Sequence, residues 1–340
     1  MPILVTGAAG FIGHHVSKRL LERGEQVIGI DNLNDYYSVE LKKARLTELQ
    51  RSHNGFSFVQ VDFSDTVSLN EALKPFDINQ VVHLGAQAGV RYSITNPHAY
   101  ITSNLMGHLN ILEYCRHTVG MKHLVYASSS SVYGSNTKLP FSVEDRVDLP
   151  ISLYAATKKS DELMSEVYSH LYRLPQTGLR FFTVYGPWGR PDMAMWLFTE
   201  AIDQGEPVKL FNGGNLRRDF TYIDDIVESI VRLMLHPAAG NPDWSGDDPD
   251  PATSRAPWRV FNIGNSEAGE VTRLVDLIEE AVGKKAKREL LPMQPGDVHA
   301  TFADVTALRN AVGFAPKTPI SEGGRSFVSW YRNYKGQGNA

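Results

Sequence analysis

The chain has 340 residues, of which 42% are hydrophobic and 21% are charged, and its formal net charge is −4. This composition supports a buried core, and no stretch of the sequence is long and apolar enough to cross a bilayer. Positive and negative residues are interspersed, without the basic stripe that contacts with a nucleic-acid backbone require. We therefore expect a soluble globular protein with no nucleic-acid partner and no membrane partner.

The single cysteine, Cys115, cannot form an internal disulfide and leaves no cysteine-based metal site. An apolar run that starts at residue 3 leaves no room for a cleavable signal peptide. These features predict a cytoplasmic protein without a bound metal.

Residues 3–31 predict a strand, a turn, a helix and a second strand, in that order. Apolar runs at 3–7 and 26–31 have the length of strands, and apolar residues recur at helical spacing over 11–24. Further runs of strand length follow, with helical stretches between them, at 56–63, 80–86, 123–130 and 177–184. This alternation predicts an α/β fold with a doubly wound, parallel Rossmann sheet.

The pattern changes near residue 185. Loops rich in proline and glycine, short strands and helical stretches such as 195–205 and 271–283 follow. We expect a Rossmann domain over 1–184 and a smaller α/β lobe, mainly for substrate, over 185–340. Two later segments, 220–235 and 258–265, are candidates for rejoining the first domain.

Gly7, Gly10 and Gly13 stand at three-residue spacing between the first strand and the first helix. Glycine at such a turn lets the backbone approach a pyrophosphate, which binds at the helix N-terminus, and lets the helix pack closely on the sheet. Asp31 ends the next strand, where a carboxylate accepts hydrogen bonds from a ribose diol and repels a 2′-phosphate. No basic residue closely follows Asp31, so we predict NAD rather than NADP; the alternative is a glycine turn that only packs. The predicted cofactor contacts include the neighbouring residues Phe11, Ile12, Asn32, Phe63 and Leu84.

Two polar residues have equal claims to a structural role and to a cofactor-binding role. Asp62 ends the third strand, where it would lie beside the adenine or form a strand-end turn. Asn104 begins a helical run and would either cap that helix or contact the cofactor.

Tyr154 and Lys158 are four residues apart and would share one face of a helix. Such a pair alone is common on protein surfaces. It follows the serine run 128–131, however, which ends an apolar strand and so belongs at the carboxyl edge of the sheet, where ligands bind. A tyrosine works as a general base when a nearby cation stabilises its phenolate, and a serine hydroxyl can bridge the phenol and the substrate oxygen. We therefore expect the tyrosine, the lysine and a serine to form a catalytic centre.

The glycine turn, the serine run and the tyrosine–lysine pair together resemble the extended short-chain dehydrogenase/reductase family over nearly the whole chain. Alignment of the serine run with sugar-nucleotide epimerases implies that Ser129 is the catalytic hydroxyl residue, with Ser128 and Ser130 as close alternatives. Related dehydratases carry Asp and Glu after this position, whereas this chain has Ser130 and Ser131. The resemblance thus implies NAD-dependent chemistry at a sugar carbon without dehydration.

The segments 205–211, 217–225 and 290–298 resemble the nucleotide-sugar contacts of the same family. The resemblance implies that Arg218 meets the diphosphate, for which a planar guanidinium fork is suited. It also implies that Gln294 and Asp297 lie near the uridine ribose, with Phe211 beside the uracil. The alternative for Arg218 is an arginine in a solvated turn.

The segments 89–100 and 181–194 closely resemble UDP-glucuronate 4-epimerases. In relatives that act on neutral UDP-glucose, the position of Thr183 is commonly asparagine. The resemblance implies that Arg190, together with Thr183, holds the C6 carboxylate of a uronic acid. Arg91 is an alternative for the same contact, and a purely structural link between loops is an alternative for Arg190.

These features favour NAD-dependent 4-epimerisation of UDP-glucuronate to UDP-galacturonate. The C4 hydride would pass to NAD+, leave a 4-keto sugar, and return to the opposite face. A UDP-glucuronate decarboxylase is less favoured because the loop around Arg190 departs from the pattern of that group. A non-catalytic NAD-sensing protein is less favoured because the tyrosine–lysine pair is complete. The resemblance also implies a homodimer formed through two helices of the first lobe.

Overall fold

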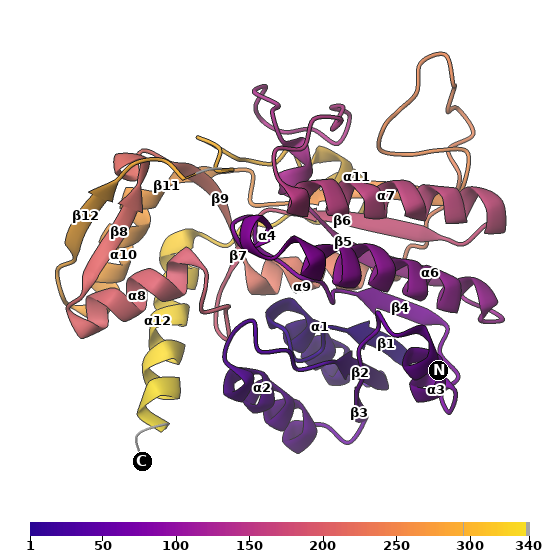
Figure 1. The fold of residues 1–340 in the computed structure, drawn as a ribbon, viewed down its shortest axis with the longest axis horizontal. Helices are drawn as coiled ribbons and strands as arrows, with labels where there is room; N and C mark the ends of the chain where they lie inside the picture. Colours follow the sequence, from indigo (N-terminus) through magenta and orange to yellow (C-terminus); the bar gives the residue numbers. More distant parts are fainter. Residues whose placement is uncertain (295, 338–340) are drawn as a thin grey trace.

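The computed structural model describes residues 1–294 and 296–337. Its main sheet has seven parallel strands in the order β10-β6-β5-β4-β1-β2-β3 (Figure 1). Strand order runs one way from β1 to β3 and the other way from β4 to β10, so the prediction of a doubly wound parallel sheet is confirmed. The strands are β1 (Ile3–Thr6), β2 (Val27–Asp31), β3 (Phe56–Gln60), β4 (Gln80–His83), β5 (His123–Ser129), β6 (Gln176–Phe181) and β10 (Trp258–Ile263).

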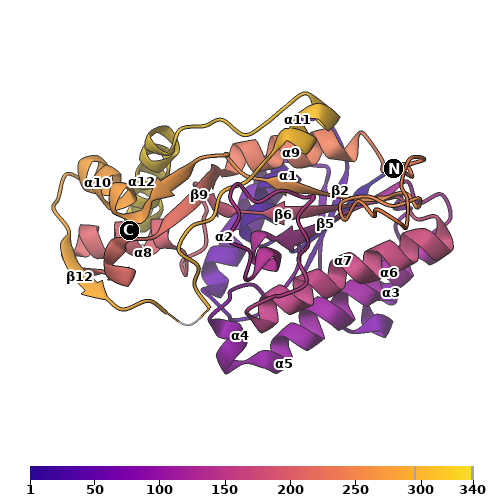
Figure 2. The ribbon, with the colours of Figure 1, turned by 90° about the horizontal axis from the view of Figure 1, so that it is seen from above.

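Helices cover both faces of this sheet (Figure 2). Strands β1 and β2 are buried along their whole length, as near-continuous apolar runs predict for strands covered on both sides. One face carries α3 (Thr66–Leu73), α6 (Gly107–His117) and α7 (Leu153–Tyr172). The other face carries α1 (Phe11–Glu22), α2 (Val39–Ser52), α9 (Ile223–Met234) and α11 (Thr306–Val312).

A second lobe lies beside the carboxyl ends of the main strands (Figure 1). It has its own core, which includes Trp196, Phe220 and Phe327. Its strands form a three-stranded sheet, β11 (Ala268–Glu270)-β9 (Arg217–Tyr222)-β7 (Thr183–Tyr185), and a two-stranded sheet, β12 (Lys287–Leu291)-β8 (Pro207–Phe211). Its helices are α8 (Ala194–Gln204), α10 (Val271–Val282) and α12 (Ile320–Gln337). The remaining short helices are α4 (Tyr92–Thr95), α5 (Pro97–Tyr100), the π-helix η1 (Ile101–Met106), and the 3₁₀ helices η2 (Ser130–Tyr133) and η3 (Asn212–Gly214).

The run 177–184, predicted as one strand, forms parts of two strands. β6 ends at Phe181 in the main sheet, and β7 begins at Thr183 in the three-stranded sheet. Apolar periodicity indicates that both pieces are extended but not which sheet each piece joins. Later in the chain, α9 packs against α1, and β10 returns to the main sheet, where it pairs in parallel with β6. The chain therefore passes between the sheets more than once beside the carboxyl end of β6.

Candidate active site

A cavity of about 1150 Å³ lies along the carboxyl edge of the main sheet and extends into the second lobe. Its wall contains the turn after β1, the ends of β2 and β5, the start of α7, the loop after β7, and parts of β8 and β9. Open parallel sheets bind ligands at this edge, where the strand order reverses. Most of the predicted site residues line this one cavity: Gly7, Gly10, Phe11, Ile12, Gly13, Asp31, Asn32, Phe63, Leu84, Arg91, Ser128, Ser129, Ser130, Tyr154, Lys158, Thr183, Arg190, Phe211, Arg218 and Asp297.

The glycine turn after β1 has a backbone geometry that side chains would prevent. Gly7 has a φ of 68°, and a Cβ there would lie 2.8 Å from the amide nitrogen of Gly85. A Cβ on Gly13 would lie 2.1 Å from the carbonyl oxygen of Gly7, so only glycine lets α1 pack this closely. Gly10 begins α1 without a side-chain cap, and this helix N-terminus lines the cavity. Its first amides therefore face an anion site suited to a pyrophosphate.

Asp31 ends β2 at the cavity and is 8% exposed. Its Oδ1 accepts a hydrogen bond from the amide of Leu33 at 2.8 Å, which fixes the carboxylate at the strand end. Burial raises the pKa of Asp31, and the charge of Lys42 partly opposes that rise. No basic residue closely follows Asp31 along the chain, but α2 brings Lys42 near it in space. The Lys42 ammonium donates to the carbonyl and side-chain oxygens of Asn34, at 2.7 and 2.8 Å.

This end of the cavity fits a dinucleotide. The helix N-terminus offers amides to a pyrophosphate, and the strand-end carboxylate offers oxygens to a ribose diol. Phe63 and Leu84 add apolar wall beside them. The residues present are therefore those that NAD requires.

Asp62, Asn104 and Gln294 lie outside the cavity wall that the described residues form. Asp62 accepts hydrogen bonds from Asn32 at 2.9 Å and from the amide and hydroxyl groups of Ser64, at 2.8 and 2.7 Å. Burial would raise the pKa of Asp62, but these hydrogen bonds keep it lowered. Asp62 therefore makes the strand-end turn and orients Asn32, which does line the cavity.

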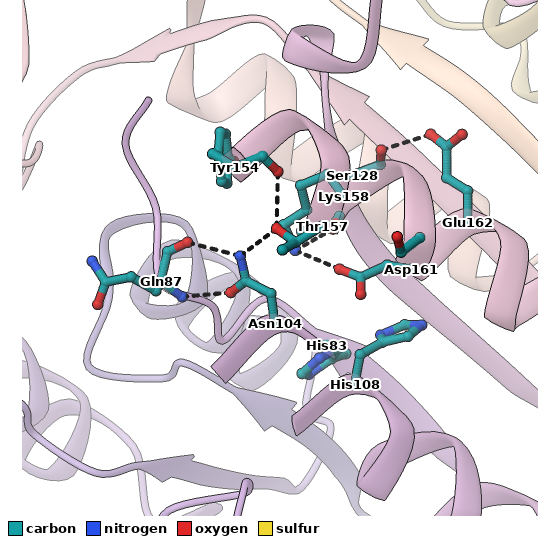
Figure 3. A network of polar contacts seen from close by, with 12 residues as sticks. His83, Gln87, Asn104, His108, Ser128, Tyr154, Thr157, Lys158, Asp161 and Glu162 are labelled. Atoms are coloured by element: carbon teal, nitrogen blue, oxygen red, sulfur yellow. Dashed lines mark hydrogen bonds and ion pairs between the residues drawn. The ribbon is translucent and has the colours of Figure 1, made fainter. Parts of the chain in front are cut away.

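The expectation that Asn104 begins a helix is wrong, because the residue lies within η1 and is 1% exposed. Its amide nitrogen donates to the Gln87 carbonyl at 3.1 Å and to the Thr157 hydroxyl at 3.0 Å, and its oxygen accepts from the Gln87 amide at 2.8 Å (Figure 3). Thr157 donates in turn to the carbonyl of Tyr154 at 2.9 Å. Asn104 thus links the loop after β4 to the helix that carries the predicted base. Helical periodicity could not separate the interior of a π-helix from a helix start.

The helix α7 presents Tyr154 and Lys158 to the cavity from its first two turns. Ser152 caps the helix through a 3.1 Å hydrogen bond from a first-turn amide, which explains why the helix begins there. The buried Lys158 ammonium donates to the carbonyl of Ala127 at 3.0 Å and to Asp161 at 3.1 Å (Figure 3). Because Ala127 lies in β5 just before the serine run, Lys158 joins the helix to the strand end.

The three candidate serines at the end of β5 have different surroundings. Ser128 is 2% exposed and donates to the buried Glu162 at 2.6 Å. Ser129 is 8% exposed, and its oxygen accepts from the Ser131 amide at 3.2 Å, while Ser130 is half-buried at the start of η2. The Ser128 hydroxyl donates its proton to a carboxylate, whereas the Ser129 hydroxyl donates to no partner among the described residues.

A set of buried titratable side chains lies behind Lys158 (Figure 3). Burial raises the pKa of Asp161 to about 7, against the opposing charge of Lys158. Burial lowers the pKa of His83 to about 3 and that of His108 well below its usual value. Both histidines are therefore neutral near pH 7, and they hydrogen-bond to buried hydroxyl groups at 2.7 and 2.8 Å. Among these four residues, Lys158 is the cation.

Arg91, Arg218 and Asp297 meet at one part of the cavity wall. Asp297 contacts the guanidinium of Arg91 at 3.1 Å and that of Arg218 at 3.8 Å. The Arg91 guanidinium also lies 4.5 Å from the ring centroid of Phe211. Gln294 is half-buried, and its backbone carbonyl accepts a hydrogen bond from the backbone amide of Asp297 at 3.2 Å. The structure thus groups Arg91 with the residues expected to contact the nucleotide.

Arg190 follows an irregular turn after β7 and lines the cavity. Trp188 has a φ of 60°, and its carbonyl and that of Gly189 accept hydrogen bonds from the buried Arg45 at 2.6 and 3.2 Å. The Arg190 guanidinium donates to both carboxylate oxygens of Asp192, at 3.0 and 2.5 Å. The guanidinium of Arg190, which is expected to hold a substrate carboxylate, is therefore already paired with the carboxylate of Asp192 in its own loop.

The sequence reasoning missed the role of Arg45. This fully buried residue of α2 donates to the carbonyl of Ala9 at 2.9 Å and to that of Trp188 at 2.6 Å, so it connects the glycine turn to the loop after β7. A signal was present, since Leu41, Arg45 and Leu49 recur at four-residue spacing and place the arginine within the buried stripe of the helix.

A Rossmann sheet with a glycine turn and a tyrosine–lysine pair at its carboxyl edge is the arrangement of the extended short-chain dehydrogenases/reductases. The chain belongs to the NAD dependent epimerase/dehydratase family, whose model it matches over residues 3–250. The cofactor is therefore NAD, as predicted.

Individual relatives resemble the chain over almost its full length. It is 48% identical over 337 residues to the probable UDP-glucuronate 4-epimerase of Rhizobium meliloti (strain 1021), with 98% of each chain covered. It is 47% identical over 338 residues to UDP-glucuronate 4-epimerase 1 of Arabidopsis thaliana, which covers 98% of this chain and 77% of that protein. The crystal structure of a UDP-glucuronic acid 4-epimerase from Bacillus cereus, in complex with UDP-glucuronic acid and NAD, superposes with a TM-score of 0.86 at 32% identity, over 98% of this chain and 100% of that one.

Within residues 1–294 and 296–337, no helix combines the length and the apolar character needed to span a bilayer. The same part of the chain contains no group of three or more His, Cys, Asp or Glu side chains arranged to hold a metal ion.

Proposed function

We propose that this protein catalyses the NAD-dependent 4-epimerisation of UDP-glucuronate to UDP-galacturonate. One observation carries the proposal: a single cavity joins the dinucleotide end to Tyr154, Lys158 and an arginine able to bind a carboxylate, Arg190. Relatives named as UDP-glucuronate 4-epimerases, similar over nearly the whole chain, support the choice of substrate.

Proton transfer at C4 is assigned to Tyr154, whose phenolate takes the proton of the C4 hydroxyl group and later returns it. Lys158, held by the carbonyl of Ala127 and by Asp161, provides the positive charge that stabilises this phenolate. Ser129 donates a hydrogen bond to the C4 oxygen and keeps it close to the tyrosine. Bound NAD+ supplies the hydride acceptor, and its reduced form the donor, so the overall reaction has no net redox change.

A second task of the site is to keep the carboxylate on the sugar. A 4-keto uronate is a β-keto acid, which loses carbon dioxide when its carboxyl bond aligns with the carbonyl π system. Arg190 and Thr183 hold the carboxylate away from that alignment. The loop of Arg190 suits this restraint because Arg45 anchors two of its backbone carbonyls.

Binding of the UDP group of the substrate is assigned to residues of both lobes. Arg218 meets the diphosphate, assisted by the nearby charge of Arg91, and Asp297 lies beside the ribose. Phe211 lies beside the uracil. The contacts among these four residues support a shared binding surface for the UDP group.

A homodimer formed through α6 and α7 is part of the proposal. Leu163, Val167 and Leu171 recur at four-residue spacing along α7 and are 56%, 48% and 60% exposed. An exposed apolar stripe of this kind is typical of helix pairing between subunits. We place the enzyme in the cytoplasm, since its one cysteine, Cys115, is a free, buried thiol.

Incubation of the purified holoenzyme with UDP-glucuronate, followed by NMR of the anomeric signals, tests the function. UDP-galacturonate should accumulate to an equilibrium mixture that is also reached from UDP-galacturonate. Formation of a UDP-pentose and carbon dioxide as the main products would identify a decarboxylase. Absence of conversion by protein that retains NAD would favour a non-catalytic role.

A further inference from the structure

Arg190 and Asp192 form a bidentate pair inside the cavity. Nε of the guanidinium donates to Oδ1 at 3.0 Å and Nη2 donates to Oδ2 at 2.5 Å, the geometry in which one edge of a guanidinium binds one carboxylate. The two side chains are 21% and 33% exposed, and both line the cavity that contains the serine run and Tyr154. A substrate carboxylate that uses this edge must therefore replace the carboxylate of Asp192.

The pair is built into a loop with little backbone freedom. Arg45 holds the carbonyls of Trp188 and Gly189, and the ring of Trp188 packs against His14 and aromatic residues of α12. The amide of Met193 donates to the carbonyl of Arg190 at 3.3 Å. Exchange of partners at Arg190 therefore requires movement of side chains rather than refolding of the loop.

Asp192 has a second partner that would remain after such an exchange. The hydroxyl group of Tyr36 donates to Oδ2 of Asp192 at 3.0 Å, from the segment between β2 and α2. Burial alone would raise the pKa of Asp192, but the charge of Arg190 keeps it lowered, so Asp192 is an anion near pH 7. When Arg190 turns to another carboxylate, Asp192 keeps the hydrogen bond from Tyr36 and is not left unpartnered.

We propose that Asp192 competes with the C6 carboxylate of the substrate for Arg190, and so sets how strongly the enzyme prefers a uronic acid to a neutral hexose; this rests on the proposed function. A UDP-uronate must exchange one carboxylate for another, whereas a neutral UDP-hexose leaves the pair intact. The competition weakens binding of the UDP-uronate and leaves binding of the neutral UDP-hexose unchanged. It also allows the substrate carboxylate to leave Arg190 when the sugar ring turns over during epimerisation.

Calorimetric binding to holoenzyme in a Tyr154→Phe background, which leaves the ligands unconverted, tests this competition. Asp192→Asn should lower the Kd for UDP-glucuronate by about two- to fivefold, the effect of a partly exposed ion pair. The Kd for UDP-glucose should stay near that of the parent, so the preference for the uronate rises. Asp192→Glu keeps a carboxylate and should leave the preference near that of the parent.

The control is Asp276→Asn, which removes the same charge from an exposed pair with Arg288 at 2.6 Å, outside the cavity, and should change neither Kd. Unchanged or weaker binding of UDP-glucuronate by Asp192→Asn would overturn the proposal, as would equal tightening for both ligands. If Asp192→Asn loses NAD, Asp192→Ala removes the same charge and carries the same expectation. Conversion of UDP-glucuronate by the unmodified enzyme is measured separately, so failure of the proposed function is distinguishable.

Discussion

The ammonium of Lys158 lies 3.1 Å from the carboxylate of Asp161, one turn further along α7, and both side chains are buried. The cation that we propose stabilises the Tyr154 phenolate thus lines the cavity and also pairs with an interior carboxyl group. Oδ1 of Asp161 has no hydrogen-bond partner among the described residues, and burial raises the pKa of this carboxyl to about 7. Titration of Asp161 therefore changes the charge around Lys158 near neutral pH.

Asp161→Asn should stabilise the fold at high pH. An unfolded aspartate titrates near 3.9, whereas the pKa of folded Asp161 is about 7, so the folded state keeps a proton that the unfolded state releases. The contribution of Asp161 to the free energy of unfolding therefore falls as the pH rises from about 4 to about 7, and is level above that. The variant lacks this loss, worth about 2 to 4 kcal/mol at about pH 8.

Urea unfolding at about pH 5 and about pH 8 measures the effect, because the stability difference between variant and native protein should grow with pH. Asp276→Asn, at an exposed carboxylate of α10, should show no such growth. A difference that stays constant across this range would contradict a titrating Asp161.

Tyr154→Phe should lower kcat by about 10²- to 10⁴-fold, the contribution of a positioned acid–base group. The ring remains, so its edge contact with Tyr100, at 6.0 Å between centroids, and the binding of UDP-glucuronate should be retained. Initial rates and calorimetric binding test both parts. Tyr172→Phe, at the exposed end of the same helix, is the control and should keep full activity. Comparable losses in both variants would remove the case for Tyr154 as the base.

The serines at the end of β5 should separate into structural and catalytic residues. Ser128→Ala removes a donor to Glu162, which keeps two hydrogen bonds from Arg180 at 2.8 and 2.9 Å, and should lower the free energy of unfolding by about 1 to 3 kcal/mol. Ser129→Ala should lower kcat by about 10²-fold with an unchanged unfolding midpoint. Denaturant titration and initial rates on both variants decide the assignment, and the reverse pattern would assign catalysis to Ser128.

Arg190→Ala should raise KM for UDP-glucuronate by about tenfold, because a charged hydrogen bond to the carboxylate is lost. It should also yield UDP-pentose, since the carboxylate of the keto sugar is less restrained. NMR of the product mixture detects the pentose. Asp192→Ala, which removes the partner but keeps the guanidinium, should not form it. If Arg190→Ala neither weakened binding nor produced pentose, the restraint assigned to Arg190 would be wrong.

Val167→Arg should convert the proposed dimer to monomers, because it places a charge within the exposed apolar stripe of α7. Light scattering coupled to gel filtration measures the mass of each species. Val67→Arg makes the same substitution at an exposed valine of α3, 67% exposed, and should leave the mass unchanged. A monomeric native protein would contradict the dimer directly.

Much of the dinucleotide end of the cavity was predictable because its constraints are local. The positive φ of Gly7 and the close approach of Gly13 to the Gly7 carbonyl involve residues of the same short turn between β1 and α1. The four-residue spacing of Tyr154 and Lys158 likewise places both on one helical face. The position of Asn104 inside η1 was not predictable, because its partners Gln87 and Thr157 come from the loop after β4 and from α7.

The sequence alone determined the alternation of strands and helices, the glycine turn and the tyrosine–lysine spacing, because each follows from neighbours a few positions apart. Only the tertiary structure decided that Lys42 stands near Asp31, that Arg45 anchors the loop after β7, and that Tyr36 shares Asp192 with Arg190. The contacts of Arg45 with Trp188 and of Tyr36 with Asp192 join segments far apart in the chain. Their partners are set by how helices and loops pack on the sheet, which residue periodicity does not encode.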